Sequence, residues 1–432
     1  MTADALTVTG THRISHVRAL EILDSRNCPT LQVTVTLADG IAATAGVPSG
    51  SSIGSGEAAE RRDHDLRRYR GLGVCGAVEA VRGPIADLLR GQEWRSLEEI
   101  DAALIELDGT PGKARLGANA IIGASMACAR ALACADGCEL WDWLSPPQVP
   151  PQLPVPHFNL IDGGVHARDG LDFQAFMVAP VGAPSVAEAV RAGSETYKAL
   201  HLLLSYRGHE TGIGDEGGFA PQLTEPEEAL RLLVMAIQEA GYEAGRAGVV
   251  IALDAAASRL RDRQGRYQLG GQRLSSDEMI ERYAEITRDF PVWLIEDGLS
   301  EDDWDGWAAL TARLGERTQL AGDDIFATNP EVITKAIARG VGNAAVIKVN
   351  QIGTVTETME AMAACRRGGY QQLVSHRSGE TPDTFISDLA VGSGCGELKA
   401  GAPARGERVA KYNRLLEIAA SRPDLCYGLA DF

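Results

Sequence analysis

Hydrophobic residues in the last two thirds of the chain fall into short continuous runs, and amphipathic stretches of helical period separate them. Such runs are typical of strands buried on both faces, as in a parallel sheet. The alternation of strand and helix predicts helical crossovers between parallel strands, and about eight such units form a closed barrel. The strands are expected at residues 249–253, 292–295, 320–322, 344–347, 372–374 and 397–398.

The first third of the chain has a different pattern. Alternating residues at 14–17 and 31–37, many of them β-branched, flank a turn segment at 24–29, and this combination predicts a hairpin. A proline-rich run at 147–156 is the best candidate for a linker. We therefore expect an α/β protein with an N-terminal α+β domain, residues 1–146, and a (β/α) barrel, residues 147–432, that carries the active site. In the first domain, helical periodicity is found at residues 57–67, 74–89, 97–107 and 118–134.

Composition narrows the class of protein. The 432 residues are 45% hydrophobic, which is ample for the core of a large barrel and a smaller domain. A net charge of −18 argues against binding to nucleic acids or anionic membranes, and no apolar run reaches the length of a membrane span. The eight cysteines show no metal-binding spacing, so we expect a reduced, cytoplasmic setting.

Polar side chains follow each predicted barrel strand. Such residues at the end of a buried strand do not contribute to stability, which suggests a functional role. In barrels the C-terminal ends of the strands build the active site. Several carboxylates at one mouth need a cation, and oxygen ligands without cysteine predict Mg²⁺ or Mn²⁺. The basic residues that follow would suit a substrate with phosphate and carboxylate groups. In chain order these residues are Asp254, Glu296 with Asp297, Asp323 with Asp324, Lys348, His376 with Arg377, and Lys399.

Three of the polar positions are candidates for direct chemistry. Lys348 directly follows a buried run, and we expect desolvation and neighbouring cations to lower its pKa so that it acts as a base. Glu216, in a glycine-rich turn, is a candidate acid for a leaving hydroxyl group, and His166 is a candidate contact for phosphate or hydroxyl. Taken singly, each has a plain alternative: a solvated lysine, a turn without a role and a loop histidine facing solvent.

Five longer motifs indicate a family. They lie at residues 214–218, 303–306, 347–353, 375–381 and 408–413, and with them the sequence resembles the enolases, the Mg²⁺-dependent dehydratases of 2-phosphoglycerate, over nearly its whole length. The resemblance implies an N-terminal α+β domain on a modified (β/α)8 TIM barrel, assembled as a homodimer or higher homo-oligomer. A metal clamp that faces a lysine base is the arrangement of enolase-superfamily sites.

The resemblance also implies a role for each matching residue. Lys348 would take the C2 proton of the substrate, and Glu216 would protonate the departing C3 hydroxyl. Ser52, in a loop at 46–54 that we expect to be mobile, would help hold a second Mg²⁺ ion. The first Mg²⁺ ion would be held by Asp254, Glu296 and Asp324. The substrate itself would be bound by His166, Gln174, His376, Arg377, Ser378 and Lys399.

The sequence departs from the enolase pattern at chemically important positions. Ala175 replaces a glutamate that works as a pair with the residue matching Glu216, so we expect Glu216 to titrate more normally. Loss of such an acid/base partner costs about 10²–10⁴ in rate. Asp162 replaces an asparagine. A segment with four arginines is either a solvated loop or a landing site for a second, larger anion: Arg259, Arg261, Arg263 and Arg266.

Three functions follow from this combination. The leading hypothesis is an enolase-like carboxyphosphonoenolpyruvate synthase, of the kind found in phosphinate antibiotic pathways, that joins a CMP-activated phosphonoformate to an enolpyruvate unit. The second is a true enolase that makes phosphoenolpyruvate, with Asp162, Asp172 or Glu210 replacing the lost glutamate. The third is a non-catalytic enolase-like binding protein, against which the complete set of predicted metal ligands and lysines speaks.

Overall fold

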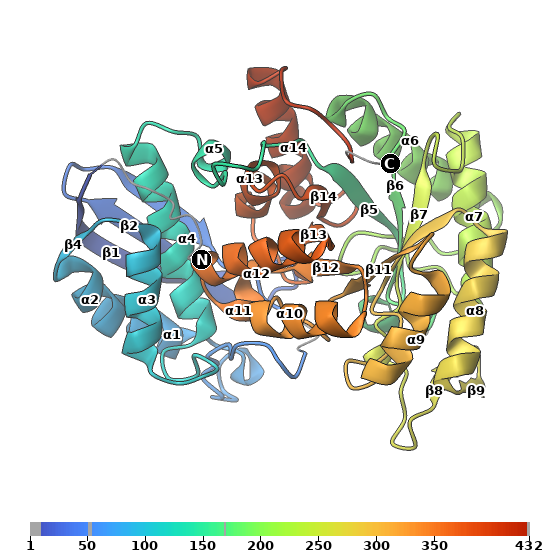
Figure 1. Cartoon of the computed structure of the whole chain (residues 1–432), viewed down its shortest axis with the longest axis horizontal. Helices are drawn as coiled ribbons and strands as arrows, with labels where there is room; N and C mark the ends of the chain where they lie inside the picture. Colours follow the sequence, from blue (N-terminus) through green and yellow to red (C-terminus); the bar gives the residue numbers. More distant parts are fainter. Residues whose placement is uncertain (1–9, 51–53, 168–169, 430–432) are drawn as a thin grey trace.

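A computed structural model describes residues 10–50, 54–167 and 170–429. Figure 1 shows a small sheet covered by helices beside a closed barrel. The small sheet has the order β3-β2-β1-β4, and the barrel has the order β10-β11-β12-β13-β14-β5-β6-β7. These two sheets confirm the expected fold class.

The small sheet contains the predicted hairpin. Strands β1 (His12–Leu23) and β2 (Pro29–Leu37) pair antiparallel, and β3 (Ala42–Gly46) and β4 (Glu93–Trp94) lie at the edges. Three of the four predicted helices are present as α1 and α2 (Cys75–Ala80 and Ala86–Arg90, joined by a π-helical turn, Val81–Ile85), α3 (Leu97–Asp108) and α4 (Ala118–Ala135). A further short helix, α5 (Leu140–Trp143), precedes the barrel.

The helix predicted at residues 57–67 was wrong. This segment has no regular secondary structure, because its polar side chains make contacts elsewhere in the molecule. Glu57 pairs with Arg377 of the barrel, and the two Asp63 carboxylate oxygens accept hydrogen bonds from the amides of Cys75 and Gly76 at the start of α1. Tertiary contacts have therefore overridden a local helical pattern.

All six predicted barrel strands are present within two residues of their expected bounds. Around them, the barrel alternates strands with helices in the order β7 (Val250–Asp254), α8 (Ser276–Asp289), β10 (Val292–Glu296), α9 (Trp304–Leu314), β11 (Gln319–Gly322), α10 (Pro330–Arg339), β12 (Ala344–Ile347), α11 (Val349–Ile352), α12 (Val355–Gly368), β13 (Gln371–Ser375), α13 (Phe385–Gly392), β14 (Gly396–Lys399) and α14 (Gly406–Ser421). A small hairpin, β8 (Tyr267–Leu269) and β9 (Gln272–Leu274), precedes α8.

The first two barrel strands depart from the repeated pattern. Strand β5 (Val155–Asp162) is followed directly by β6 (Ala175–Ala179), and the helices α6 (Val186–Tyr206) and α7 (Pro226–Glu239) come after both. The six strands predicted from the sequence are parallel to one another, as expected, whereas β6, which the sequence did not reveal, runs antiparallel to both of its neighbours. Among the described residues of the connection at 163–174, the one helical turn is Gly164–His166, and parallel neighbours are usually joined by a longer helical crossover.

Each sheet is covered by buried helices. Within the described residues, α4 is the one helix long and apolar enough to cross a membrane, and 83% of it is buried inside the protein, where it packs on β2 and β3. Helices α11 and α12 of the barrel contact α4, which joins the two sheets into one molecule (Figure 1). Two buried or half-buried ion pairs reinforce this contact, Lys113 with Glu357 and Arg130 with Asp383.

Candidate active site

The polar residues at the strand ends meet in one small pocket at the C-terminal mouth of the barrel. The pocket is small, with a volume of about 10 Å³, and it is lined by nine of the residues predicted from the sequence. Because neighbouring strands are hydrogen-bonded in register, Glu296 lies beside Asp254, and Lys399 lies beside Ser375. The nine predicted residues are His166, Gln174, Glu216, Asp254, Lys348, His376, Arg377, Ser378 and Lys399.

The acidic half of the mouth is held together by a lysine. Lys399 Nζ donates to Asp254 Oδ2 at 2.9 Å and to Glu296 Oε2 at 2.7 Å. Burial, followed by the charge of Asp254, raises the pKa of Glu296 to about 8. Although burial acts to lower the pKa of Lys399, the two carboxylates raise it well above its ordinary value. Two carboxyl groups in this part of the site therefore share one ammonium group, and the raised pKa of Glu296 keeps a proton on it at neutral pH.

A second group of carboxylates lies next to the first. Acidic oxygens of Asp297, Asp323 and Asp324 lie within 4.8 Å of one another, and Asp297 accepts hydrogen bonds from the amides of both neighbours. Burial and the adjacent Asp323 raise the pKa of Asp324 to about 7. Among the described residues, the buried Glu296 Oε1 has no hydrogen-bond partner. Crowded, partly unsatisfied oxygen donors of this kind fit a hard divalent cation.

The pKa of Lys348 differs from the sequence prediction. Lys348 Nζ contacts Asp323 Oδ2, and Asp323 Oδ1 accepts a hydrogen bond of 2.9 Å from Gln351 Nε2. Burial lowers the pKa of Lys348, but the charges of Asp323 and Glu296 outweigh burial and leave that pKa above its ordinary value. The prediction of a lowered pKa was wrong because an acidic partner faces the ammonium group more closely than the neighbouring cations do.

Glu216 lies between two histidines. Its carboxylate oxygens are 3.4 Å from His166 Nε2 and 3.3 Å from His376 Nε2. Burial raises the pKa of Glu216, but His376 and His166 outweigh it and hold that pKa well below its ordinary value. Burial lowers the pKa of His376 to about 3, so this imidazole is neutral and acts on Glu216 as a hydrogen-bond donor. The expectation that Glu216 titrates normally was therefore wrong.

The first domain contributes to the site. The guanidinium of Arg377 forms a two-pronged pair with Glu57 at 2.9 and 3.0 Å, and it also donates to Asn350 Oδ1 at 2.9 Å. The Glu57 side chain is nearly fully buried in this contact. Sequence analysis did not identify Glu57, because an isolated acid in a polar segment carries no local signal of a partner 320 residues away.

Two other residues that sequence analysis assigned no role support the site. Arg408 donates to His376 and to the carbonyl oxygens of Arg377 and Ser378, and Asn159 donates to Glu216. Arg408 stands in one of the five recognised motifs, which is the signal that would have identified it. Because His376 Nδ1 accepts a hydrogen bond from the Arg408 guanidinium, the proton of the neutral imidazole is on Nε2, which faces Glu216.

Several predicted site residues do not line this pocket. Ser52 lies outside the described residues. Glu296 and Asp324 adjoin the pocket without lining it, and Asp324 faces a neighbouring cavity beside Ser55 and Glu301. The arginine-rich segment directly precedes β8, and its Arg261 packs over the Tyr267 ring, 5.9 Å from the ring centroid. None of its members lines the pocket: Arg259, Arg261, Arg263 and Arg266.

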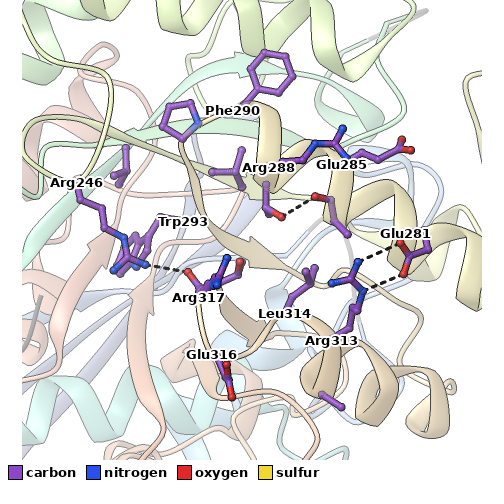
Figure 2. A pocket seen from close by; sticks show the side chains of 17 residues that line it. Arg246, Glu281, Glu285, Arg288, Phe290, Trp293, Arg313, Leu314, Glu316 and Arg317 are labelled. Carbon is purple, nitrogen blue, oxygen red and sulfur yellow. Dashed lines mark hydrogen bonds and ion pairs between the residues drawn. The ribbon is translucent and has the colours of Figure 1, made fainter.

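A much larger pocket lies at the opposite end of the barrel. Figure 2 shows it between α8 and α9, at the N-terminal ends of β7, β10 and β11, with a volume of about 960 Å³. Two of its arginines are already engaged: Arg313 pairs with Glu281 at 3.0 Å, and Arg246 donates to the backbone carbonyl of Arg317 at 2.9 Å. It contains none of the strand-end residues, and barrel enzymes keep their chemistry at the other face.

Comparison with known proteins agrees with this geometry. Residues 14–144 match the family described as "Enolase, N-terminal domain", and residues 150–424 match "Enolase, C-terminal TIM barrel domain". The chain belongs to the enolase family. It is an enolase-superfamily enzyme with the hydro-lyase chemistry of that family, which removes the non-catalytic alternative.

Known relatives align with this enolase-family chain over almost its whole length. The chain is 52% identical over 411 residues to "Enolase" from Acidothermus cellulolyticus, which covers 95% of each protein. It is 52% identical over 405 residues to "Enolase" from Mycobacterium leprae and 51% identical over 407 residues to "Enolase" from Rubrobacter xylanophilus, with 94% of each chain covered. These names support enolase itself, and they give no support to the carboxyphosphonoenolpyruvate synthase that led the sequence hypotheses.

Proposed function

We propose that this enolase-family protein is a phosphopyruvate hydratase, which converts 2-phosphoglycerate into phosphoenolpyruvate and water. The observation that carries the proposal is one small pocket that contains Lys348 and Glu216 together with the basic side chains of Arg377 and Lys399. A lysine and a carboxyl group in one site suit a reaction that removes a proton at one carbon and protonates a leaving group at the next. Either residue alone would not provide both proton transfers.

The proposed reaction balances with the groups in the pocket. Lys348 takes the C2 proton, and the electron pair left behind forms the C2–C3 double bond as the C3–O bond breaks. The hydroxyl leaves as water with a proton from Glu216. Arg377 and Ser378 would bind the phosphate, and Lys399 would face the carboxylate. Since Glu57 already holds Arg377 by two bonds, phosphate binding must share or displace this partner.

The acidic residues fit Mg²⁺ as the cofactor, with one or two ions bound. Asp254, Glu296 and Asp324 would hold the first ion. Asp254 and Glu296 share Lys399, and Glu296 keeps an unused acceptor atom, whereas Asp324 belongs to the adjoining carboxylate group with Asp297 and Asp323. The ion would stabilise the negative charge that develops when the C2 proton leaves. It would also offset the carboxylate field that raises the pKa of Lys348.

The first test is direct. Purified protein with Mg²⁺ and 2-phosphoglycerate should produce the ultraviolet absorbance of an enol product, and phosphorus NMR should identify phosphoenolpyruvate. Omission of Mg²⁺ should abolish the signal. Full metal binding with no product would contradict the hydratase.

The same assay separates the hydratase from the synthase. CMP-activated phosphonoformate should neither be consumed nor change the rate, because the arginines expected to receive it do not line the pocket. Consumption of this compound together with 2-phosphoglycerate would favour the synthase instead. No described contact favours that outcome.

A further inference from the structure

A second buried carboxyl group lies beneath Glu216. Asp162 ends strand β5 and is 1% exposed. Its Oδ2 accepts a hydrogen bond of 3.3 Å from the Glu216 amide, and its Oδ1 accepts one of 3.2 Å from Asn159 Nδ2. The same Asn159 Nδ2 donates to the Glu216 carboxylate. Asp162 therefore holds both the backbone and, through Asn159, the side chain of Glu216.

The turn that carries Glu216 is shaped around this carboxylate. Gly214 and Gly218 flank the turn, and a Cβ atom on either residue would overlap the Asp162 carboxylate. The Asp162 amide also donates to the carbonyl of Phe219 at 2.8 Å. Close approach of two backbones is the usual reason for glycine at such positions. Three separate contacts thus fix the position of the turn relative to Asp162.

The register of the barrel explains why Asp162 takes this place. Asp162 lies directly opposite Ala175 in the antiparallel pair of β5 and β6. Ala175 is fully buried and offers no polar atom, so Asp162 supplies the carboxyl group in this pair of facing residues. The two other acids considered from the sequence lie elsewhere. Asp172 caps the amide of Gly270 at 2.7 Å, and Glu210 is exposed.

The charges around the two carboxyl groups push their proton affinities apart. Burial, followed by the charge of Glu216, raises the pKa of Asp162 to about 8, whereas His376 and His166 hold the pKa of Glu216 low. Two carboxyl groups in one buried site share a proton in this way. The other charged or titratable groups that act on the pair, or that the pair acts on, are Lys399, Arg408, Tyr197 and Tyr412.

We propose that Asp162 is a positioning residue for Glu216, which fixes the direction of the Glu216 carboxyl and keeps one proton within the pair until the leaving hydroxyl takes it. This proposal rests on the proposed hydratase function. The pair holds one proton at neutral pH and loses it as the pH rises through about 8. Activity that depends on this proton should therefore decline above that pH.

The test is Asp162→Asn, with Asp172→Asn as a matched control on the neighbouring loop. Asp162→Asn should lower kcat about 10- to 100-fold with little change in KM, since a positioned acid contributes about 10²–10⁴. It should also remove the decline in kcat near pH 8. Asp172→Asn should keep both the rate and the pH profile. An Asp162→Asn enzyme with the wild-type rate and profile would overturn the proposal.

The protonation of Asp162 can also be measured without substrate, so this second test does not depend on the proposed function. Infrared difference spectra are taken across about pH 8 in a Glu296→Gln, Asp324→Asn background, because those two buried carboxyl groups also release protons near this pH. They should show a buried protonated carboxyl band that disappears as the pH rises. Asp162→Asn should lack the band and Asp172→Asn should keep it. A band that persists in Asp162→Asn would contradict the assignment, even if 2-phosphoglycerate proved not to be the substrate.

A double variant tests whether the position of the second carboxyl group matters. Asp162→Asn combined with Ala175→Glu moves the carboxyl group to the facing strand, directly opposite position 162. It should recover at least part of the lost kcat and a decline at alkaline pH. Rescue would show that the pair needs a second carboxyl group. A folded, metal-binding double variant as inactive as Asp162→Asn would count against that role.

Discussion

At the scale of single residues, protonation in this site is decided by the nearest partner. Lys348 and Glu216 are both buried, and burial alone would lower the pKa of the lysine and raise that of the acid. Both pKa values move the other way, because Asp323 contacts the lysine and two imidazoles flank the acid. The side chains that perform the proposed chemistry are therefore in their charged forms, and substrate and metal must change that balance.

Lys348→Met tests the base. We expect a loss of about 10²–10⁴ in kcat, and loss of exchange of the substrate C2 hydrogen with deuterated solvent, because the other lysine of the pocket, Lys399, is held by Asp254 and Glu296. Proton NMR of 2-phosphoglycerate in deuterium oxide measures the exchange. Lys335→Met is the control, since this lysine lies on α10 with Nζ 5.0 Å from the Trp304 ring. Undiminished exchange in Lys348→Met would mean that another group removes the proton.

At the scale of elements, the site depends on how closely helices approach the barrel strands. Helix α6 begins at an N-cap, Ser185, whose hydroxyl accepts from the Glu188 amide, and it packs along β5. The contact is close at Gly193, where a Cβ atom would overlap the Phe158 ring. Strand β5 ends at Asp162, so a helix pushed outward would also disturb the residue beneath Glu216.

Gly193→Ala should lower the free energy of unfolding by about 1–3 kcal/mol, the usual cost of an overpacked core. It should also reduce kcat, because the position of β5 would change. Gly83→Ala is the control, since a Cβ there meets no atom within 4 Å and alanine favours a helix by about 0.5–1 kcal/mol. Denaturant unfolding measures both variants. Equal stability of the two would show that β5 and α6 separate at little cost.

At the scale of the whole molecule, the proposed function requires a protein of net charge −18 to bind an anionic substrate. Basic side chains gather at the C-terminal end of the barrel, and the first domain contacts that end through Glu57. The Glu57–Arg377 pair crosses between the domains at the pocket itself, and Lys113–Glu357 and Arg130–Asp383 cross farther away. The remaining excess of carboxylates in the mouth is what a divalent cation would neutralise.

Mg²⁺ should therefore stabilise the folded protein, and removal with EDTA should reverse the effect. At about 100 times Kd the stabilisation expected from mass action is about 2.7 kcal/mol, visible as a rise in Tm. Glu296→Gln should remove most of this rise, whereas Glu106→Gln, on the exposed face of α3, should leave it intact. Differential scanning calorimetry makes the comparison. A rise in Tm that is the same in both variants would place the ion elsewhere.

The sequence by itself determined six of the eight barrel strands, the first hairpin and the order of polar residues at the strand ends, because periodicity and burial are local properties of a chain. A closed barrel then brings the strand ends together, which is why nine predicted residues share one pocket. Only the tertiary structure decided the direction of β6, the reach of Glu57 to Arg377 and the position of Asp162 opposite Ala175. It also placed the arginine segment away from the pocket and set the charges of Lys348 and Glu216, since distances between remote residues and the fields they create arise only from packing.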